Sequence, residues 1–268
     1  MRIQISKILL GLALSFYLSV PFIQQAQADD TEVYFVDGGV IEPGKSQIML
    51  LFEYSSAMEG GDRLLKVKEA LETLAGNGVD PLTDDQQAIV ESVDFGLAVF
   101  QKGNGNSGPE GIIRYPIGDS VAYTPDFKTV LADLLSEPTQ KGNTPTIEGM
   151  SEVYRYFQSM KLNYAVTNKT HGGSHNGTNY TFASSDSDCA SKALIVLAHG
   201  QINGSEWPNA TAGVTPANKC SGKNCLGTDM VKYMREEGDV STYTISPGSN
   251  GNNINNLNSW AKAGGTDA

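Results

Sequence analysis

The sequence predicts an α/β fold: a doubly wound, mostly parallel sheet with one antiparallel edge hairpin. Residues 46–53 (SQIMLLFE) and 192–198 (KALIVLA) are near-continuous apolar runs, which is typical of strands covered on both faces of a parallel sheet. Segments with apolar residues at helical spacing follow most strand candidates, and this alternation favours parallel strands joined by helices. We therefore expect the element order β-α-β-β-α-α-β-α-β-α.

The first strand candidate is followed by a helix and then by two strands. Leucine and valine recur at helical spacing in residues 62–75, with Asp62 as the expected N-cap and Gly-Asn-Gly at 76–78 as the stop. Residues 92–100 (SVDFGLAVF) and 111–117 (GIIRYPI) predict two strands. A Gly- and Asn-rich segment joins them, so we expect these two strands to form the hairpin.

The second half of the chain contributes the remaining elements and two polar insertions. The expected helices cover residues 124–135, 146–160, 227–237 and 253–263, and the expected strands cover residues 192–198 and 241–246. Residues 161–191 and 201–224 are rich in Asn, Gly, Ser and Thr and poor in large apolar side chains. Stretches of this length and composition predict long polar surface insertions, which are usually functional or mobile.

The amino terminus predicts an export signal. Arg2 and Lys7 precede an apolar run at residues 8–20, and Ala-Gln-Ala at 26–28 supplies small residues where a signal peptidase cleaves. A retained membrane anchor is the alternative, but the run is shorter than the roughly 20 residues that a membrane span needs. We expect residues 1–28 to be a signal peptide and the protein to be exported.

The remaining chain is expected to form an amino-terminal extension at residues 29–45 and one domain at residues 46–268. The full sequence has 19 Lys+Arg and 30 Asp+Glu, and the signal peptide contains two of the basic residues and none of the acidic ones. This acidity argues against nucleic-acid partners and against docking on anionic lipid, since both need clustered Lys and Arg. Membrane attachment is expected only through partners.

The three cysteines predict a disulfide. Cys220 and Cys225 close a short loop, and an oxidising compartment favours their pairing. Cys189 precedes a strand candidate and is the alternative partner for either of them. A zinc site is the competing interpretation, but the three cysteines lack C-x-x-C spacing.

Polar residues collect where the predicted parallel strands end. Glu53, Ser55 and Ala57 alternate after the first strand, Thr144 lies in a Gly-Asn-Thr-Pro-Thr loop, and His199 follows the strand at 192–198. Ligands of doubly wound sheets bind beyond the carboxyl ends of the strands. Oxygen ligands spaced two apart, joined by a threonine from another loop, suit a hard divalent cation.

This arrangement resembles the von Willebrand factor A domain, whose metal-ion-dependent adhesion site uses Asp-x-Ser-x-Ser, a loop Thr and an Asp-Gly. The resemblance implies Glu53, Ser55, Thr144 and His199 as the metal positions. Three of the family's ligands are altered, because Glu53 and His199 replace aspartates and Ala57 contributes no oxygen. We therefore expect no resident cofactor and weak or absent binding of Mg²⁺ or Ca²⁺.

Further stretches resemble a narrower family. The stretches that carry this second resemblance are residues 93–100 with Arg-Tyr-Pro-Ile at 114–117, Gly-Asn-Thr-Pro-Thr at 142–146 with Tyr-Arg-Tyr-Phe at 154–157, and Cys189 ahead of an apolar strand. They are similar to the amino-terminal domain of PilC/PilY type IV pilus tip adhesins. The resemblance implies a secreted adhesion and pilus-biogenesis module that is not an enzyme. The location that it implies is the periplasm, the outer membrane, the cell surface or the pilus tip of a bacterium. Its implied partners are minor pilins or a host or abiotic surface.

The same resemblance implies that the domain is truncated at its carboxyl end. The family continues through a last strand and helix into a large β-propeller, whereas this sequence stops at Ala268. We expect the strand at 241–246 to have an unpaired edge and a partly uncovered face, both of which favour aggregation.

A secreted hydrolase on the same sheet is the alternative function. Ser55, His199 and Glu53 are the residue types of a nucleophile, base and acid, but no G-x-S-x-G elbow surrounds the serine. His171 and His175 have the spacing of a helical metal pair. Two glycines lie between these histidines, so we expect a loop there instead.

Overall fold

The computed structural model describes residues 35–36, 39–40, 45–60, 62–76, 82–100, 111–118, 123–139, 145–162, 169–182, 190–199, 226–248 and 251–266. The predicted signal peptide, residues 1–28, lies outside these ranges. The chain divides into two compact units, Met1–Glu42 and Pro43–Ala268. In the first unit, β1 (Phe35–Val36) pairs antiparallel with β2 (Gly39–Val40). No helix among the described residues has the length and apolar character needed to cross a membrane.

The second unit contains a five-stranded sheet with the predicted mixture of strand directions. Its strands are β3 (Ser46–Glu53), β4 (Val93–Phe100), β5 (Ile112–Gly118), β6 (Lys192–Leu197) and β7 (Val240–Ile245). Their order is β5-β4-β3-β6-β7, with β3 in the centre. β4, β3, β6 and β7 are parallel, while β5 is antiparallel to β4 and forms the edge. The predicted fold class and edge hairpin are confirmed.

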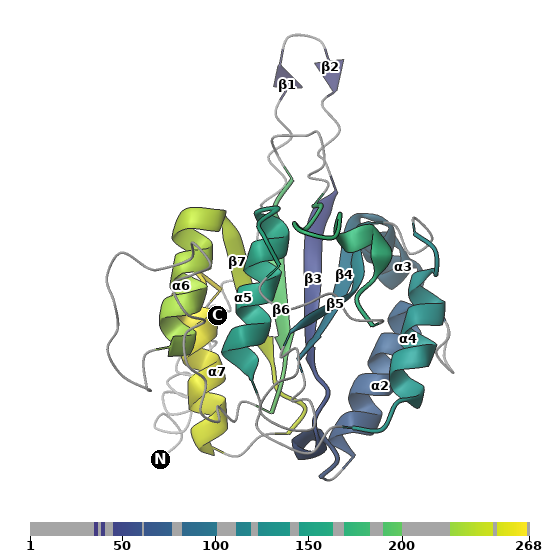
Figure 1. Cartoon of the computed structure of the whole chain (residues 1–268), viewed down its shortest axis with the longest axis vertical. Helices are drawn as coiled ribbons and strands as arrows, with labels where there is room; N and C mark the ends of the chain where they lie inside the picture. The colour runs from purple at the N-terminus through teal and green to yellow at the C-terminus, as the bar shows by residue number, and fades with distance from the viewer. Residues whose placement is uncertain are drawn as a thin grey trace, which may run out of the picture. The chain divides into compact units, whose positions relative to one another are not determined.

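Helices cover both faces of this sheet (Figure 1). On one face lie α5 (Thr146–Phe157), α6 (Leu226–Gly238) and α7 (Gly251–Ala263). On the other lie α2 (Arg63–Leu74), α3 (Asp84–Glu91) and α4 (Phe127–Ser136). Two short 3₁₀ helices, η1 (Ser56–Met58) and η2 (Gly172–Ser174), lie in loops.

The central strand β3 explains why the apolar run at residues 46–53 does not alternate. Met49 and Leu51 lie in the apolar cluster shared with α5, α6 and α7. Leu50 and Phe52 lie in the cluster shared with α2 and α4. Because successive side chains of a strand point to opposite faces, a strand with helices on both sides needs apolar residues at every position.

The α2 and α3 side differs from the sequence expectation in two details. Asp62 is the N-cap residue of α2, as predicted, but its side chain makes no cap hydrogen bond, and its φ of 24° and ψ of 6° differ from the extended conformation usual for a capping residue. The helix Asp84–Glu91 was not expected from the sequence. Its first turn is acidic and most of its side chains are exposed, so it lacks the apolar periodicity by which a surface helix is recognised.

Part of the predicted polar insertion at residues 161–191 belongs to the core. Tyr180 is only 3% exposed, and its hydroxyl donates to the Glu152 carboxylate of α5 at 2.6 Å. The rings of Tyr180 and Phe182 pack edge-on against Tyr156. Two aromatic side chains in an otherwise polar segment therefore pack against α5, all of whose residues are buried.

The two edge strands are partly closed by nearby segments. At β5, the backbone N–H of His171 donates to the carbonyl of Ile113 at 3.0 Å. At β7, the N–H of Thr242 donates to the carbonyl of Gly264 at 3.3 Å, and the hydroxyl of Thr266 donates to the Thr242 carbonyl. The expectation of an unpaired edge is therefore wrong at Thr242, because the segment after α7 turns back onto the strand.

Candidate functional site

Glu53, Ser55 and His199 meet at the carboxyl ends of β3 and β6. Glu53 is the last residue of β3 and is 0% exposed. The Ser55 hydroxyl donates to its Oε1 at 2.6 Å, and the backbone N–H of His199 donates to its Oε2 at 2.7 Å. Parallel strands end at the same edge of the sheet, which brings these residues together across 146 positions of sequence.

The structure does not describe every residue that the sequence predicted for this site. Thr144 lies outside the described residues. The three cysteines of the predicted disulfide, Cys189, Cys220 and Cys225, also lie outside them. Ala57 lies in η1, where its backbone is described but its side chain is not. The predicted ligand set is therefore represented by Glu53, Ser55 and His199 alone.

The two histidines with metal-pair spacing are each bound to their own loop. Nδ1 of His171 accepts from the Gly173 N–H at 3.0 Å, so its Nε2 carries the proton and donates to the Pro125 carbonyl at 3.2 Å. Nδ1 of His175 accepts from the Gly177 N–H at 2.9 Å. The segment is a loop around a 3₁₀ turn, as expected. Nδ1 of each ring accepts from the backbone of this loop, while Nε2 of His171 joins the loop to Pro125, ahead of α4.

Arg63 is a neighbour of the Glu53 site that sequence reasoning missed. It is the first residue of α2, and its Nη1 donates to the carbonyl of Gly248, after β7, at 3.4 Å. A Cβ placed on Gly60 would lie 2.4 Å from Nη2 of Arg63, so the guanidinium lies where a side chain at residue 60 would be. Only the fold brings the loop after β3 and the turn after β7 to the same arginine.

The charge of Arg63 acts on both titratable groups of the site. Burial raises the pKa of Glu53, and this effect outweighs the hydrogen bonds from Ser55 and His199 and the positive charge of Arg63, which lower it. Burial also lowers the pKa of the His199 imidazole, and the charge of Arg63 lowers it further. The imidazole is therefore neutral at physiological pH.

The described residues do not fit the divalent cation that the A-domain resemblance implies. Both carboxylate oxygens of Glu53 accept hydrogen bonds from the chain itself. Among the described residues, no three or more His, Cys, Asp or Glu side chains gather into a group that would hold a metal. The positive charge of Arg63, which acts to lower the pKa of Glu53, also disfavours a second cation at that carboxylate.

The same geometry differs from a hydrolase triad. In such a triad the serine hydroxyl donates to an imidazole, and the acid accepts from that imidazole. Here the Ser55 hydroxyl donates directly to Glu53, and His199 reaches Glu53 through its backbone N–H. The three residues are adjacent, but their roles are those of a closed hydrogen-bonded cluster.

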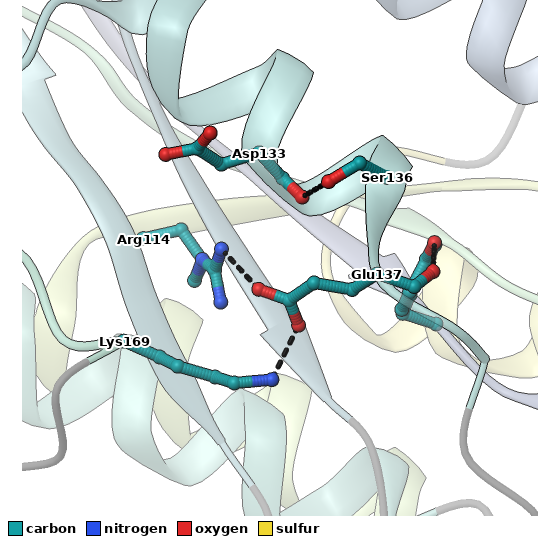
Figure 2. Close-up of polar contacts among 6 residues, drawn as sticks. Arg114, Asp133, Ser136, Glu137 and Lys169 are labelled. Carbon is teal, nitrogen blue, oxygen red and sulfur yellow. Dashed lines mark hydrogen bonds and ion pairs between the residues drawn. The ribbon is translucent and has the colours of Figure 1, made fainter.

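A second candidate site, which the sequence did not predict, is a cavity of about 500 Å³ between β5, the end of α4 and residues 169–172. Figure 2 shows Arg114 and Lys169 converging on the carboxylate of Glu137. Nη2 of Arg114 donates to Oε1 at 2.8 Å, and Nζ of Lys169 donates to Oε2. The cavity also contacts Pro125, Val130, Asp133 and Ser136.

The electrostatics of this cavity are set by its central carboxylate. Burial would raise the pKa of Glu137, but the hydrogen bonds and charges of Lys169 and Arg114 outweigh burial and hold it below its ordinary value. Glu137 is therefore ionised at neutral pH. Arg114 is a buried strand residue (5% exposed), and Lys169 lies in the predicted polar insertion. No local sequence motif therefore indicates that the two side chains meet at Glu137.

No family model matches the chain, and no curated protein matches it in sequence. Similar solved structures include proximal thread matrix protein 1 from the mussel byssus, at 16% identity and a TM-score of 0.45 over 81% of this chain. The pilus adhesin SpaC from Lactobacillus rhamnosus GG has 14% identity and a TM-score of 0.46 over 76%. The SpRpn10 VWA domain has 11% identity and a TM-score of 0.44 over 81% of this chain and 80% of its own length.

The chain spans only 41% of the mussel protein and 24% of the adhesin. At these identities and TM-scores, the assignment of the fold rests on the strand order and on the helices covering both faces of the sheet. The mixed α/β fold, with four parallel strands and one antiparallel edge strand, is shown by that topology.

Proposed function

We propose that this protein is an exported binding module of the adhesion type, acting in type IV pilus biogenesis or surface attachment and not as an enzyme. The observation that carries this proposal is the closed cluster at the carboxyl ends of β3 and β6. Both oxygens of Glu53 and the proton of Ser55 are used in internal hydrogen bonds, and this bonding differs from that of a serine activated by a base.

The proposed contact with a partner is the cavity around Glu137. Its charged groups have both signs and come from a strand, a helix end and a loop. A polar lining of this kind suits the side chains of a protein partner better than an apolar small molecule, because small-molecule pockets are mostly apolar. The resemblance of residues 114–117 to pilus tip adhesins supports a pilin as that partner, since Arg114 lines the cavity.

The test is binding of the purified mature chain to immobilised minor pilins by biolayer interferometry. We expect the wild type to bind and Lys169→Glu to weaken binding at least about tenfold, as loss of a desolvated interfacial charge does. Lys262→Glu, an exposed lysine on α7, is the charge-matched control and should bind like the wild type. Absence of binding to pilins and to abiotic surfaces would reject the proposal.

A secreted hydrolase remains the second candidate, because Ser55, Glu53 and His199 are adjacent. If the protein is a binding module, the wild type should hydrolyse acyl esters such as p-nitrophenyl acetate no faster than the Ser55→Ala variant does. An activity that requires Ser55 and withstands removal of divalent ions would favour a serine hydrolase over the binding module.

A further inference from the structure

We infer that the cavity between β5, the end of α4 and residues 169–172 binds one carboxylate group of the partner, which Arg114 and Lys169 hold. The inference rests on the proposed function, in which this cavity is the contact with the partner, and it adds the chemistry that the cavity recognises. It follows from a buried donor of Arg114, from the balance of charge around Glu137, and from the apolar part of the cavity wall.

The first step concerns the guanidinium of Arg114. Its Nη2 donates to Oε1 of Glu137 at 2.8 Å, whereas its Nη1 is buried and has no hydrogen-bond partner within the described part of the chain. A buried donor without an acceptor is unfavourable, and a guanidinium can only donate. Arg114 is 5% exposed and lines the cavity, so a molecule bound there can supply the acceptor that completes its bonding.

The second step concerns the charge of the group that fits beside Arg114. Glu137 is negative at neutral pH, so it leaves one net positive charge when it is counted with Arg114 and Lys169. Asp133 also lines the cavity, but it is exposed and forms no ion pair with either cation in the described ranges. A carboxylate brings one negative charge and matches this excess, whereas a phosphate group brings about 1.5–2.

The third step concerns the path of the carboxylate and the rest of the wall. The two cations approach Glu137 from β5 and from the loop at residue 169 (Figure 2). The Lys169 side chain is 32% exposed and that of Arg114 only 6%, so the ammonium lies nearer to solvent than the guanidinium. Pro125 and Val130 add apolar surface against which the methylene groups beside a carboxylate can pack. An acidic side chain and a C-terminal carboxylate share this chemistry.

The experiment titrates the isotope-labelled mature chain with three short peptides, and the backbone amide NMR signals of residues 169–172 are the readout. Acetyl-Ala-Glu-Ala-amide carries only a side-chain carboxylate, acetyl-Ala-Gln-Ala carries only a C-terminal one, and acetyl-Ala-Gln-Ala-amide carries neither. We expect saturable shifts with an acidic peptide and none with the neutral peptide. The acidic peptide that binds more tightly identifies the source of the carboxylate.

Variants of the two cations test which groups hold the carboxylate. Arg114→Gln should abolish the shifts, and Lys169→Gln should weaken binding about tenfold, as loss of one hydrogen bond between charged groups does. Because Lys169 is partly exposed, its variant tests the inference even where Arg114→Gln does not fold. Lys262→Gln, an exposed lysine on α7, is the matched control and should bind like the wild type.

Four results would overturn the inference: no binding of either acidic peptide, equal binding of the neutral peptide, tighter binding of inorganic phosphate, or unchanged affinity in Lys169→Gln. Its failure is distinguishable from failure of the proposed function. Minor pilins that bind while no acidic peptide shifts the signals would reject the carboxylate site and keep the binding module. Acidic peptides that bind while no pilin or surface does would keep the carboxylate site and reject the proposed function.

Discussion

The hydroxyl of Ser55 donates to Oε1 of Glu53 at 2.6 Å, two residues earlier in the chain. The other oxygen of Glu53 accepts from the His199 backbone at 2.7 Å, so the carboxylate is held entirely by its own fold. An acid used in this way ties the loop after β3 to the loop after β6. This end of the sheet is thereby fixed in shape before any partner arrives.

Divalent metal binding at this end of the sheet is expected to be undetectable. Ala57 contributes no oxygen, His199 replaces an acid, and the carboxylate of Glu53 is already engaged. Calorimetric titration with Mg²⁺, Mn²⁺ and Ca²⁺ checks this. A micromolar isotherm that Thr144→Ala abolishes would contradict it and restore the predicted ligand set.

Glu137→Gln is expected to destabilise the protein at neutral pH by about 2 kcal/mol, the scale of hydrogen bonds to charged groups. The pKa of Glu137 is lowered in the folded state, so its ionised form stabilises the fold above the ordinary value of 4.5. That contribution is lost as the pH falls through the lowered folded pKa. The difference between variant and wild type should therefore shrink below pH 4.5.

Urea unfolding at several pH values measures this difference. Glu236→Gln is the control, because Glu236 pairs with Lys232 at 3.7 Å with both side chains exposed, and such pairs contribute less than about 1 kcal/mol. If the loss of stability caused by Glu137→Gln stays the same in acid, the effect is due to packing and not to the charge of Glu137.

Tyr180→Phe tests whether the segment after α5 is part of the core. Its hydroxyl donates to the buried side chain of Glu152, and removing this donor from a buried acceptor should cost about 1–3 kcal/mol. Tyr243→Phe is the matched control, since Tyr243 is 49% exposed. Equal stability of the two variants would place Tyr180 outside the cooperative core.

Gly149→Ala is expected to destabilise the protein although alanine favours helices. A Cβ at residue 149 would lie 2.8 Å from Cβ of Phe100, so α5 would have to move away from β4 at a cost of about 1–3 kcal/mol. Gly172→Ala, which would meet nothing within 4 Å, should leave stability nearly unchanged. Thermal unfolding of the two variants measures this difference. A loss of stability for Gly149→Ala alone would show that close packing, and not the flexibility of glycine, accounts for the residue at position 149.

The local sequence pattern was sufficient to predict helices that are amphipathic and strands that are buried on both faces. It failed for α3 (Asp84–Glu91), whose polar surface gives no periodicity, and for Tyr180, whose burial depends on contact with Glu152. The candidate site was predicted in part, because Glu53 ends one strand, His199 lies just beyond another, and the continuous apolar runs of these two strands indicate that they are parallel. Arg63 was missed because no pattern marks an arginine that reaches back over the preceding loop.

The sequence by itself determined where the strands lie along the chain, their burial on both faces and the edge hairpin, since continuous apolar runs are stable only inside a covered sheet. Only the tertiary structure decided which charges meet. Arg114 and Glu137 are 23 residues apart, and Glu137 and Lys169 are 32 apart. Such contacts depend on how loops close over the sheet, and that closure is decided by the summed packing of the whole domain.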